Sequence, residues 1–293
     1  MRLLGLFCIL LLIMPGCINL KTDDFPKGNI ISPPNDAIIP KKYSVIDSDI
    51  PLTYYGKIDG VEIGYQIAPH NVAMKSLEAF YKYHDTGEES YKRRGLYLAD
   101  WLLANATYRG AGNFVVWEYN YPWPPYNLKS GWTGSLNQAT IIKALSFAYL
   151  YSKDLKYIEM INKSLNAFEV DVKNGGLRIT REDEGIDYVW YPEYAKENPP
   201  YVLNGFITVL IRLREYYLIT TDKKAEKLYL EGLESLVHYL PDYDAGEKKS
   251  YYDALGNIAN NHYHEMHVAQ LCSLYEYTKN PIFKEYKEKW ERE

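Results

Sequence analysis

The sequence predicts an all-α protein built as an (α/α) toroid or incomplete barrel of about four helical hairpins. Apolar residues recur at helical spacing in eight segments, and most of these pair across short loops. Long segments rich in aromatic residues and proline separate the pairs. In such a ring the inner helices are the more apolar ones, and functional residues are expected where the long loops converge.

The first hairpin shows the pattern clearly. The stretch "HNVAMKSLEAFYKYHDTG" places apolar residues at helical spacing and stops at Gly87, and "EESYKRRGLYLADWLLANAT" follows at once. The remaining hairpins are expected over residues 135–176, 201–244 and 265–293. Two aromatic inserts interrupt them: residues 108–134, too proline-rich for a helix and expected to be a loop or strand pair, and residues 177–200, expected to be irregular.

The N-terminus reads as a secretion signal. Residues 1–17, "MRLLGLFCILLLIMPGC", combine one positive charge, an apolar run and a small residue before Cys17. Cleavage after residue 16 would make Cys17 the new N-terminus and the carrier of a lipid anchor, whereas an uncleaved signal anchor is the alternative. Either interpretation places the protein on the extracellular face of the membrane. We expect a tether with a short β segment over residues 17–69 and the helical catalytic domain over residues 70–293.

The composition narrows the class of ligand. The chain has 33 Lys and Arg against 38 Asp and Glu, with no basic run, which argues against nucleic acid as a partner. It also has 30 tyrosines and 6 tryptophans, but only 8 phenylalanines. Because tyrosine joins an apolar ring to a polar hydroxyl group, this high tyrosine content favours solvent-accessible aromatic sites where rings stack on sugars. A compositional habit of the organism would give the same numbers.

Three stretches are more specific than the fold class. They are "LKSGWTGSLNQATIIKALSFAYLYSKD", "WYPEYAKENPPYVLNGF" and "LPDYDAGEKKSYYDALGNIANNHYHEMHVAQL", the last followed by "PIFKEYKEKW". Together they resemble the C-terminal catalytic domain of the heparosan/heparan sulfate D-glucuronyl C5-epimerases. The resemblance runs from about Leu128 to Trp290 with the motifs in the family's order.

The resemblance implies that C5 of a glucuronic acid residue is inverted within a polysaccharide, giving iduronic acid. Such a catalyst must neutralise the sugar carboxylate, place a base on one face of C5 and deliver a proton from the other. No cofactor and no metal are needed. On the family pattern the catalytic residues fall on Glu193, Tyr252 and Tyr263. A free phenol has a pKa of about 10, so a tyrosine acting as base must be tuned by its neighbours.

The resemblance also implies a set of substrate-binding residues. Tyr194 lies beside the catalytic glutamate and Asn204 matches an asparagine that would hold the sugar, with helix capping as the alternative for Asn204. His264 and His267 are expected to donate hydrogen bonds to the tyrosines. Hydrogen bonds to the substrate or to core carbonyls are an alternative, and with His262 or Glu265 nearby the two histidines could instead bind zinc.

Further binding residues come from the aromatic segments. Trp132 and Gln138 are expected either to line the substrate site or to pack in the core. The segment "YNYPWPPYN" offers Tyr121, Trp123 and Tyr126 as a sugar-stacking platform or as a rigid cover for the barrel.

The chain departs from the family pattern at three places. The loop between Tyr252 and Tyr263 is shorter than in the animal enzymes, and Leu255 stands where those enzymes have an arginine. Arg178 or Arg181 is therefore expected to contact the substrate carboxylate. The animal enzymes also have an N-terminal β-domain that contributes to the substrate site and to the dimer, so a homodimer is left open here.

Two other functions fit the same scaffold. A polysaccharide lyase also abstracts the C5 proton of a uronate but then expels the C4 substituent. A non-catalytic lipoprotein that binds glycans is the third hypothesis.

Overall fold

The computed structural model describes residues 50–291. The predicted signal peptide, the predicted lipid attachment at Cys17 and the predicted tether up to residue 49 lie outside this range. Within it, no helix combines the length and the apolar character needed to cross a membrane.

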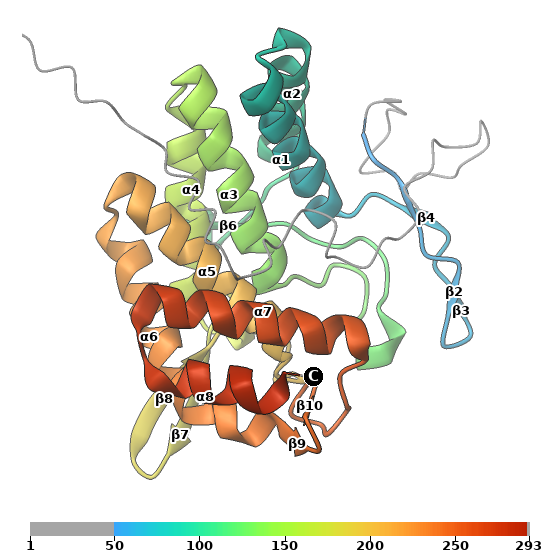
Figure 1. The fold of residues 1–293 in the computed structure, drawn as a ribbon. Helices are drawn as coiled ribbons and strands as arrows, with labels where there is room; N and C mark the ends of the chain where they lie inside the picture. Colours follow the sequence, from blue (N-terminus) through green and yellow to red (C-terminus); the bar gives the residue numbers. More distant parts are fainter. Residues whose placement is uncertain (1–49, 292–293) are drawn as a thin grey trace, which may run out of the picture.

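Four helical hairpins make up the body of the described chain (Figure 1). Their helices are α1 Pro69–Thr86 with α2 Glu89–Ala104, α3 Ser135–Ser152 with α4 Lys156–Asn166, α5 Leu203–Thr220 with α6 Lys223–Tyr239, and α7 Asn261–Thr278 with α8 Pro281–Trp290. Short connections join the partners. The α1–α2 connection turns at Gly87, whose φ of 73° is left-handed, a conformation that glycine adopts without strain.

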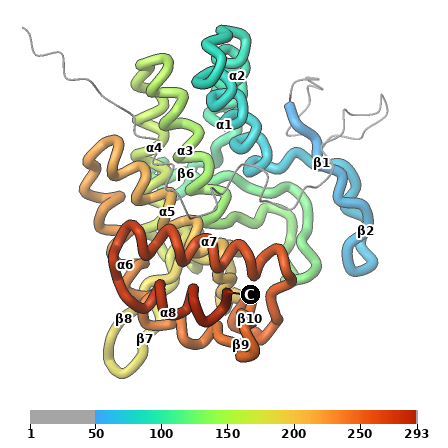
Figure 2. Tube along the Cα trace, viewed as in Figure 1, coloured from blue at the N-terminus to red at the C-terminus, as the bar shows by residue number. Residues whose placement is uncertain are grey.

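The first helix of each hairpin lies on the inside of the arrangement. In sequence α1 packs on α3, α3 on α5, and α5 on α7, while each second helix packs mainly on its own partner (Figure 2). The four hairpins thus follow one another as part of a ring. This confirms the predicted incomplete (α/α) barrel.

Burial separates the inner helices from the outer ones. α5 buries every residue from Leu203 to Ile211, so its N-terminal half is covered on all sides. α4 and α6 instead bury a single stripe and leave charged residues in water. The core between the layers is strongly aromatic. Trp190, for example, stacks on Phe206 with ring centroids 3.8 Å apart.

The strands of the described chain form five separate antiparallel pairs. They are β1 Thr53–Tyr54 with β4 Tyr65–Gln66, β2 Lys57–Ile58 with β3 Val61–Glu62, β5 Thr107–Arg109 with β6 Phe114–Val116, β7 Ile179–Asp183 with β8 Ile186–Trp190, and β9 Asp244–Gly246 with β10 Lys249–Ser250. The first insert therefore begins with the predicted strand pair. The second insert, expected to be irregular, is instead a regular hairpin followed by a loop.

Candidate active site

Glu193 lies where two inner helices begin. The segment that follows β8 runs beside the start of α3, since the Ser135 amide donates to the Pro192 carbonyl at 3.0 Å and the Ala195 amide to the Thr133 carbonyl at 2.9 Å. Gly134 lies directly against the Glu193 backbone. A Cβ at position 134 would fall 1.9 Å from the Glu193 carbonyl oxygen, so only glycine fits there.

The Glu193 side chain packs against the first turn of α5. A Cβ at Gly205 would fall 2.2 Å from Glu193 Oε2, so the absence of a side chain at this position makes room for the carboxyl group. Oε2 is buried and makes no hydrogen bond within residues 50–291. A buried carboxyl oxygen without a partner is costly unless a ligand or a proton satisfies it.

Burial shifts the ionisation of this carboxyl group. Loss of water raises the pKa of Glu193 to about 7, against the smaller opposing effect of a hydrogen bond from the Tyr194 side chain. The group can therefore exchange a proton near neutral pH, which is what a general base or acid requires.

Tyr252 and Tyr263 reach this carboxyl group from one loop and one helix. The Leu203 amide donates to the Tyr252 carbonyl at 3.0 Å, which fastens the loop to the start of α5. Tyr263 lies in the first turn of α7, where its amide donates to the side chain of the capping residue Asn260. The two phenol rings lie 4.6 Å apart between centroids. The short loop between the two tyrosines therefore brings both of them into the same site.

The phenols and the carboxyl group affect one another's ionisation. Burial raises the pKa of Tyr263, Tyr252 and Glu193, and the neighbouring side chain of Tyr252, Tyr194 and Tyr194, respectively, opposes this rise. Burial and the nearby Glu193 charge raise the pKa of Tyr252, Tyr263 and Tyr194 above the ordinary phenol value. At neutral pH all three are consequently protonated, and Glu193 is the group among these four that ionises first.

An aromatic wall surrounds this group. The Tyr126 ring lies 4.6 Å from that of Tyr194, and the Trp132 ring 5.7 Å from it. Trp123 packs against the same small cluster and connects it to a second one around Tyr121. Trp123, Tyr126 and Trp132 are partly buried and come from the first insert, so this insert supplies one side of the group.

The two histidines do not contact the tyrosines. Both are buried, and the Nδ1 atoms of His264 and His267 each lie 2.9 Å from the Ser250 hydroxyl, while His264 Nε2 lies 3.0 Å from the Trp290 carbonyl. The expectation that they donate to the phenols is therefore wrong. They join β10, α7 and α8 behind the site. Within residues 50–291, no group of three or more His, Cys, Asp or Glu side chains is arranged to hold a metal ion.

The arginines expected to bind the substrate carboxylate are engaged elsewhere. Arg178 donates to Glu231 on α6 at 2.9 Å, and Arg181 lies 3.8 Å over the Tyr239 ring. Neither is among the groups that shift the pKa of Glu193, Tyr252 or Tyr263. Leu255 has 66% of its surface exposed. The structure thus does not support either arginine as the carboxylate contact.

Gln138 and Asn204 have different surroundings. Gln138 is buried and its Nε2 donates to the carbonyls of Val115 and Ser164, which matches the core-packing alternative and not a place in the site. Asn204 lies in the first turn of α5 beside Gly205 and caps no helix, because Val202 is the N-cap residue. Its Oδ1 is buried without a hydrogen bond among the described residues.

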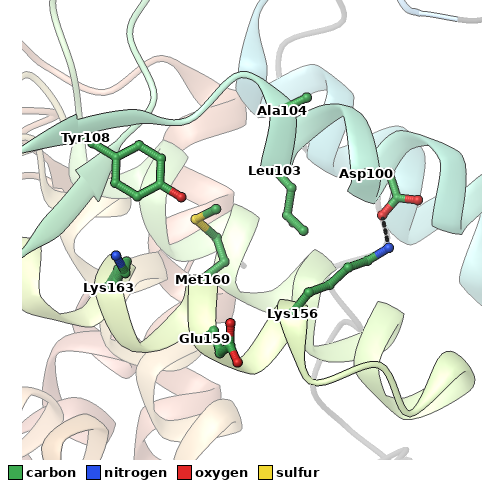
Figure 3. A pocket seen from close by; sticks show the side chains of 8 residues that line it. All are labelled: Asp100, Leu103, Ala104, Tyr108, Lys156, Glu159, Met160 and Lys163. Carbon is green, nitrogen blue, oxygen red and sulfur yellow. Dashed lines mark ion pairs between the residues drawn. The ribbon is translucent and has the colours of Figure 1, made fainter. Parts of the chain in front are cut away.

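A separate hollow lies away from this group. It encloses about 540 Å³ between α2, β5 and α4 and is bordered by Tyr108, Met160 and Lys163 among others (Figure 3). Three of its charged groups are already engaged: Lys156 pairs with Asp100 at 2.9 Å, and Lys163 donates to the Gly112 carbonyl. We therefore locate the candidate active site at Glu193.

Gly134 and Gly205 are the site residues that sequence reasoning missed. Each stands inside a stretch quoted above, "GWTGSLNQ" or "VLNGF", directly at the start of an inner helix. Glycine is unfavourable inside a helix, so Gly205 was a readable signal of close approach.

Two relatives share much of this sequence. An uncharacterized protein of Methanocaldococcus jannaschii is 43% identical over 263 residues, which cover 86% of this chain and 85% of that protein. The D-glucuronyl C5-epimerase of Caenorhabditis elegans is 30% identical over 210 residues, which cover 66% of this chain and 33% of the epimerase. The chain thus spans only about a third of the nematode enzyme.

Solved structures with similar chain traces include two kinds of carbohydrate enzyme. An unsaturated glucuronyl hydrolase from Streptococcus agalactiae gives a TM-score of 0.48 at 16% identity, covering 74% of this chain and 55% of that one. A family 76 mannosidase from Bacteroides thetaiotaomicron gives a TM-score of 0.48 at 11% identity, covering 78% and 62%.

The family comparison covers the site itself. The model described as "D-glucuronyl C5-epimerase C-terminus" matches residues 111–292, which is more than half of the chain and includes Glu193, Tyr194, Tyr252 and Tyr263. The chain therefore belongs to the D-glucuronyl C5-epimerase C-terminus family.

Proposed function

We propose that this protein epimerises glucuronate residues at C5 within a polysaccharide, giving iduronate residues. The observation that carries the proposal is the grouping of Glu193, a carboxyl group of pKa about 7, with the neighbouring phenols Tyr194, Tyr252 and Tyr263, whose pKa values the Glu193 charge raises. Family membership supports an epimerase acting on a uronate.

The ionisation order suggests the roles. Ionised Glu193 takes the C5 proton, leaving an enolate-like carbanion that is delocalised into the substrate carboxyl group. Tyr263 or Tyr252 then gives a proton to the opposite face of C5, and the configuration inverts. The raised pKa of each phenol keeps it protonated at neutral pH, so a proton is available to the strongly basic carbanion at C5.

Substrate charge also requires a favourable environment. α3, α5 and α7 begin around the site and carry no acidic residue in their first turns, whereas α2, α4 and α6 each carry a glutamate there. The positive ends of the inner helices would favour an anionic sugar. The aromatic wall, including Trp123 and Trp132, would hold neighbouring sugar rings.

Product analysis tests the reaction. Purified protein is incubated with heparosan or another glucuronan, and the polymer is examined by NMR for iduronate and by ultraviolet absorbance for unsaturated uronates. We expect iduronate without ultraviolet absorbance. Unsaturated products would identify a lyase, and unchanged polymer that still binds the protein would identify a glycan-binding protein. The matched controls are Glu193→Gln and, on the surface, Glu184→Gln.

We also propose that the enzyme acts on the extracellular side of a membrane, held by a lipid on Cys17. The sequence of residues 1–17 supports this. Mass spectrometry of the N-terminal peptide from the native source would show the lipid, and an unmodified Cys17 in the membrane-free fraction would contradict it.

A further inference from the structure

The residue that follows Tyr252 has an unusual environment. Asp253 is completely buried, and its carboxylate accepts hydrogen bonds from the amides of Leu255 and Asn257 and from the Asn257 side chain at 2.9 Å. A buried carboxylate is tolerated only when donors of this kind surround it. The Asp253 side chain thus closes a tight turn formed by residues 253–257.

This turn controls the backbone of Tyr252. Within it the Tyr252 amide donates to the Asn257 carbonyl at 2.7 Å, and the Ala254 amide donates to the Pro200 carbonyl at 2.9 Å. The Tyr252 carbonyl in turn accepts a hydrogen bond from the Leu203 amide, so the amide end of this residue is held within the turn and its carbonyl end is held against the start of α5.

Asp253 also holds a second phenol. The Tyr126 hydroxyl donates to Asp253 Oδ2 at 3.2 Å, across 127 positions of sequence. The Tyr126 ring packs at a tilt against that of Tyr194, and the Glu193 and Tyr263 charges both act on the ionisation of Tyr126. One buried carboxylate therefore connects the loop that carries Tyr252 to the insert that carries the aromatic wall.

We infer that Asp253 is the positioning residue of this site, which holds Tyr252 at its working distance from Glu193 and fixes Tyr126 beside Tyr194. Asp253 does not touch the substrate and acts through these two phenols. The inference rests on the proposed epimerase function for its kinetic consequence, but its structural consequence is measurable without a substrate.

The kinetic test compares Asp253→Asn with Asp242→Asn, an exposed aspartate that makes no hydrogen bond or ion pair among the described residues. Misplacement of a catalytic group by about 1 Å costs on the order of 100-fold in rate, so Asp253→Asn should lower kcat by about 10- to 100-fold with little change in KM. Asp242→Asn should keep the wild-type values. An unchanged kcat in folded Asp253→Asn would overturn the inference.

A double-mutant cycle separates positioning from general loss of stability. If Asp253 acts partly through Tyr126, the effects of Tyr126→Phe and Asp253→Asn on kcat are less than additive in the double variant. Full additivity would remove Tyr126 from the inference. Should Asp253→Asn fail to fold, Tyr126→Phe and Asn257→Ala each remove one partner of the carboxylate, and wild-type kcat in both would overturn the inference.

A measurement without substrate distinguishes this inference from the proposed function. In protein labelled at tyrosine Cζ, the Tyr252 and Tyr126 signals are assigned by Tyr252→Phe and Tyr126→Phe. We expect Asp253→Asn to shift both signals and Asp242→Asn to shift neither. Absence of epimerisation in the wild type would defeat the proposed function, whereas unshifted signals in Asp253→Asn would defeat only the positioning role.

Discussion

Glu193 combines features that rarely occur together in a side chain with a purely structural role. Its Oε2 is buried without a hydrogen bond in the described chain, the pKa of its carboxyl group is raised to about 7, and its charge raises the pKa values of three neighbouring phenols. Structural carboxylates instead collect donors, as Asp253 does. This contrast between the two acidic residues is why we propose Glu193 as the reacting group and Asp253 as the supporting one.

The pH dependence of the rate follows from this ionisation. If ionised Glu193 takes the C5 proton, kcat/KM rises with pH through about 7, the pKa of the free enzyme's base. A pH–rate profile on a glucuronan checks this. A rate that falls through the same range would show that protonated Glu193 acts as the acid instead.

Stability should respond to Glu193 in the opposite sense to activity. Folding raises the pKa of Glu193 from 4.5 to about 7. The contribution of its bound proton to the free energy of unfolding is therefore fully present below pH 4.5 and is lost as the pH rises through 7. Glu193→Gln, which cannot ionise, should therefore be more stable than wild type at pH 8, by at most about 3 kcal/mol.

Chemical denaturation at pH 4.5 and pH 8 measures this difference. The Gln variant's advantage in free energy of unfolding should shrink towards pH 4.5. An advantage that is equal at both pH values would show that Glu193 does not carry a raised pKa.

At the scale of elements, the first turn of α5 packs directly against the Glu193 side chain at Gly205. Gly205→Ala would place a Cβ 2.2 Å from Glu193 Oε2, so the carboxyl group must move. Alanine favours the helix by about 1 kcal/mol, which partly offsets the crowding. We expect kcat to fall on the order of 100-fold with a small change in thermal stability.

The control for this prediction is Gly232→Ala on α6. Its Cβ would fall 2.4 Å from a Leu210 methyl group, in the core and away from Glu193. This variant should lose stability while the folded fraction keeps its kcat. Equal kcat in both alanine variants would mean that the α5 turn does not position Glu193.

β10, α7 and α8 meet at the Ser250 hydroxyl. Ser250→Ala would leave the buried Nδ1 atoms of His264 and His267 without this partner, and each unsatisfied buried group costs roughly 1–3 kcal/mol. Urea unfolding should show this loss, whereas Ser273→Ala, which removes only a bond within α7, should show much less. A loss no greater than that of Ser273→Ala would contradict the junction's importance.

Helix periodicity predicted most elements, and the failures have local causes. The predicted helix from residue 155 ends at Asn166, because the chain then turns back and the Leu177 amide pairs with the Ala167 carbonyl. The hairpin in the second insert turns at Glu184 and Gly185, both with positive φ, a two-residue turn hidden in a charged stretch.

Site residues could be predicted where they belong to a recognisable motif, but not where their role depends on the direction in which the side chain points. The stretch around Tyr252 and Tyr263 indicated the phenols, and the structure groups them with Glu193. Spacing alone could not show that His264 and His267 point to Ser250, since residues three apart share a face without revealing what that face contacts.

At the scale of the whole molecule, the open ring gathers residues from distant parts of the chain. Insert residues before α3, the segment before α5, and the loop and first turn of α7 all meet where the inner helices begin (Figure 1). The chain carries a net charge of −5, yet the first turns of α3, α5 and α7 contain no acidic residue, which is consistent with the anionic substrate that we propose.

Exchange of the C5 hydrogen with solvent is the most direct test of the central claim that the Glu193 group removes and replaces that proton. Wild-type protein, Glu193→Gln and Glu184→Gln are each incubated with a glucuronan in deuterated buffer, and deuterium at C5 is measured by NMR and mass spectrometry. We predict deuterium at C5 with the wild type and with Glu184→Gln, and none with Glu193→Gln. Undiminished exchange with Glu193→Gln, or no exchange by folded wild type on any glucuronan, would contradict the claim.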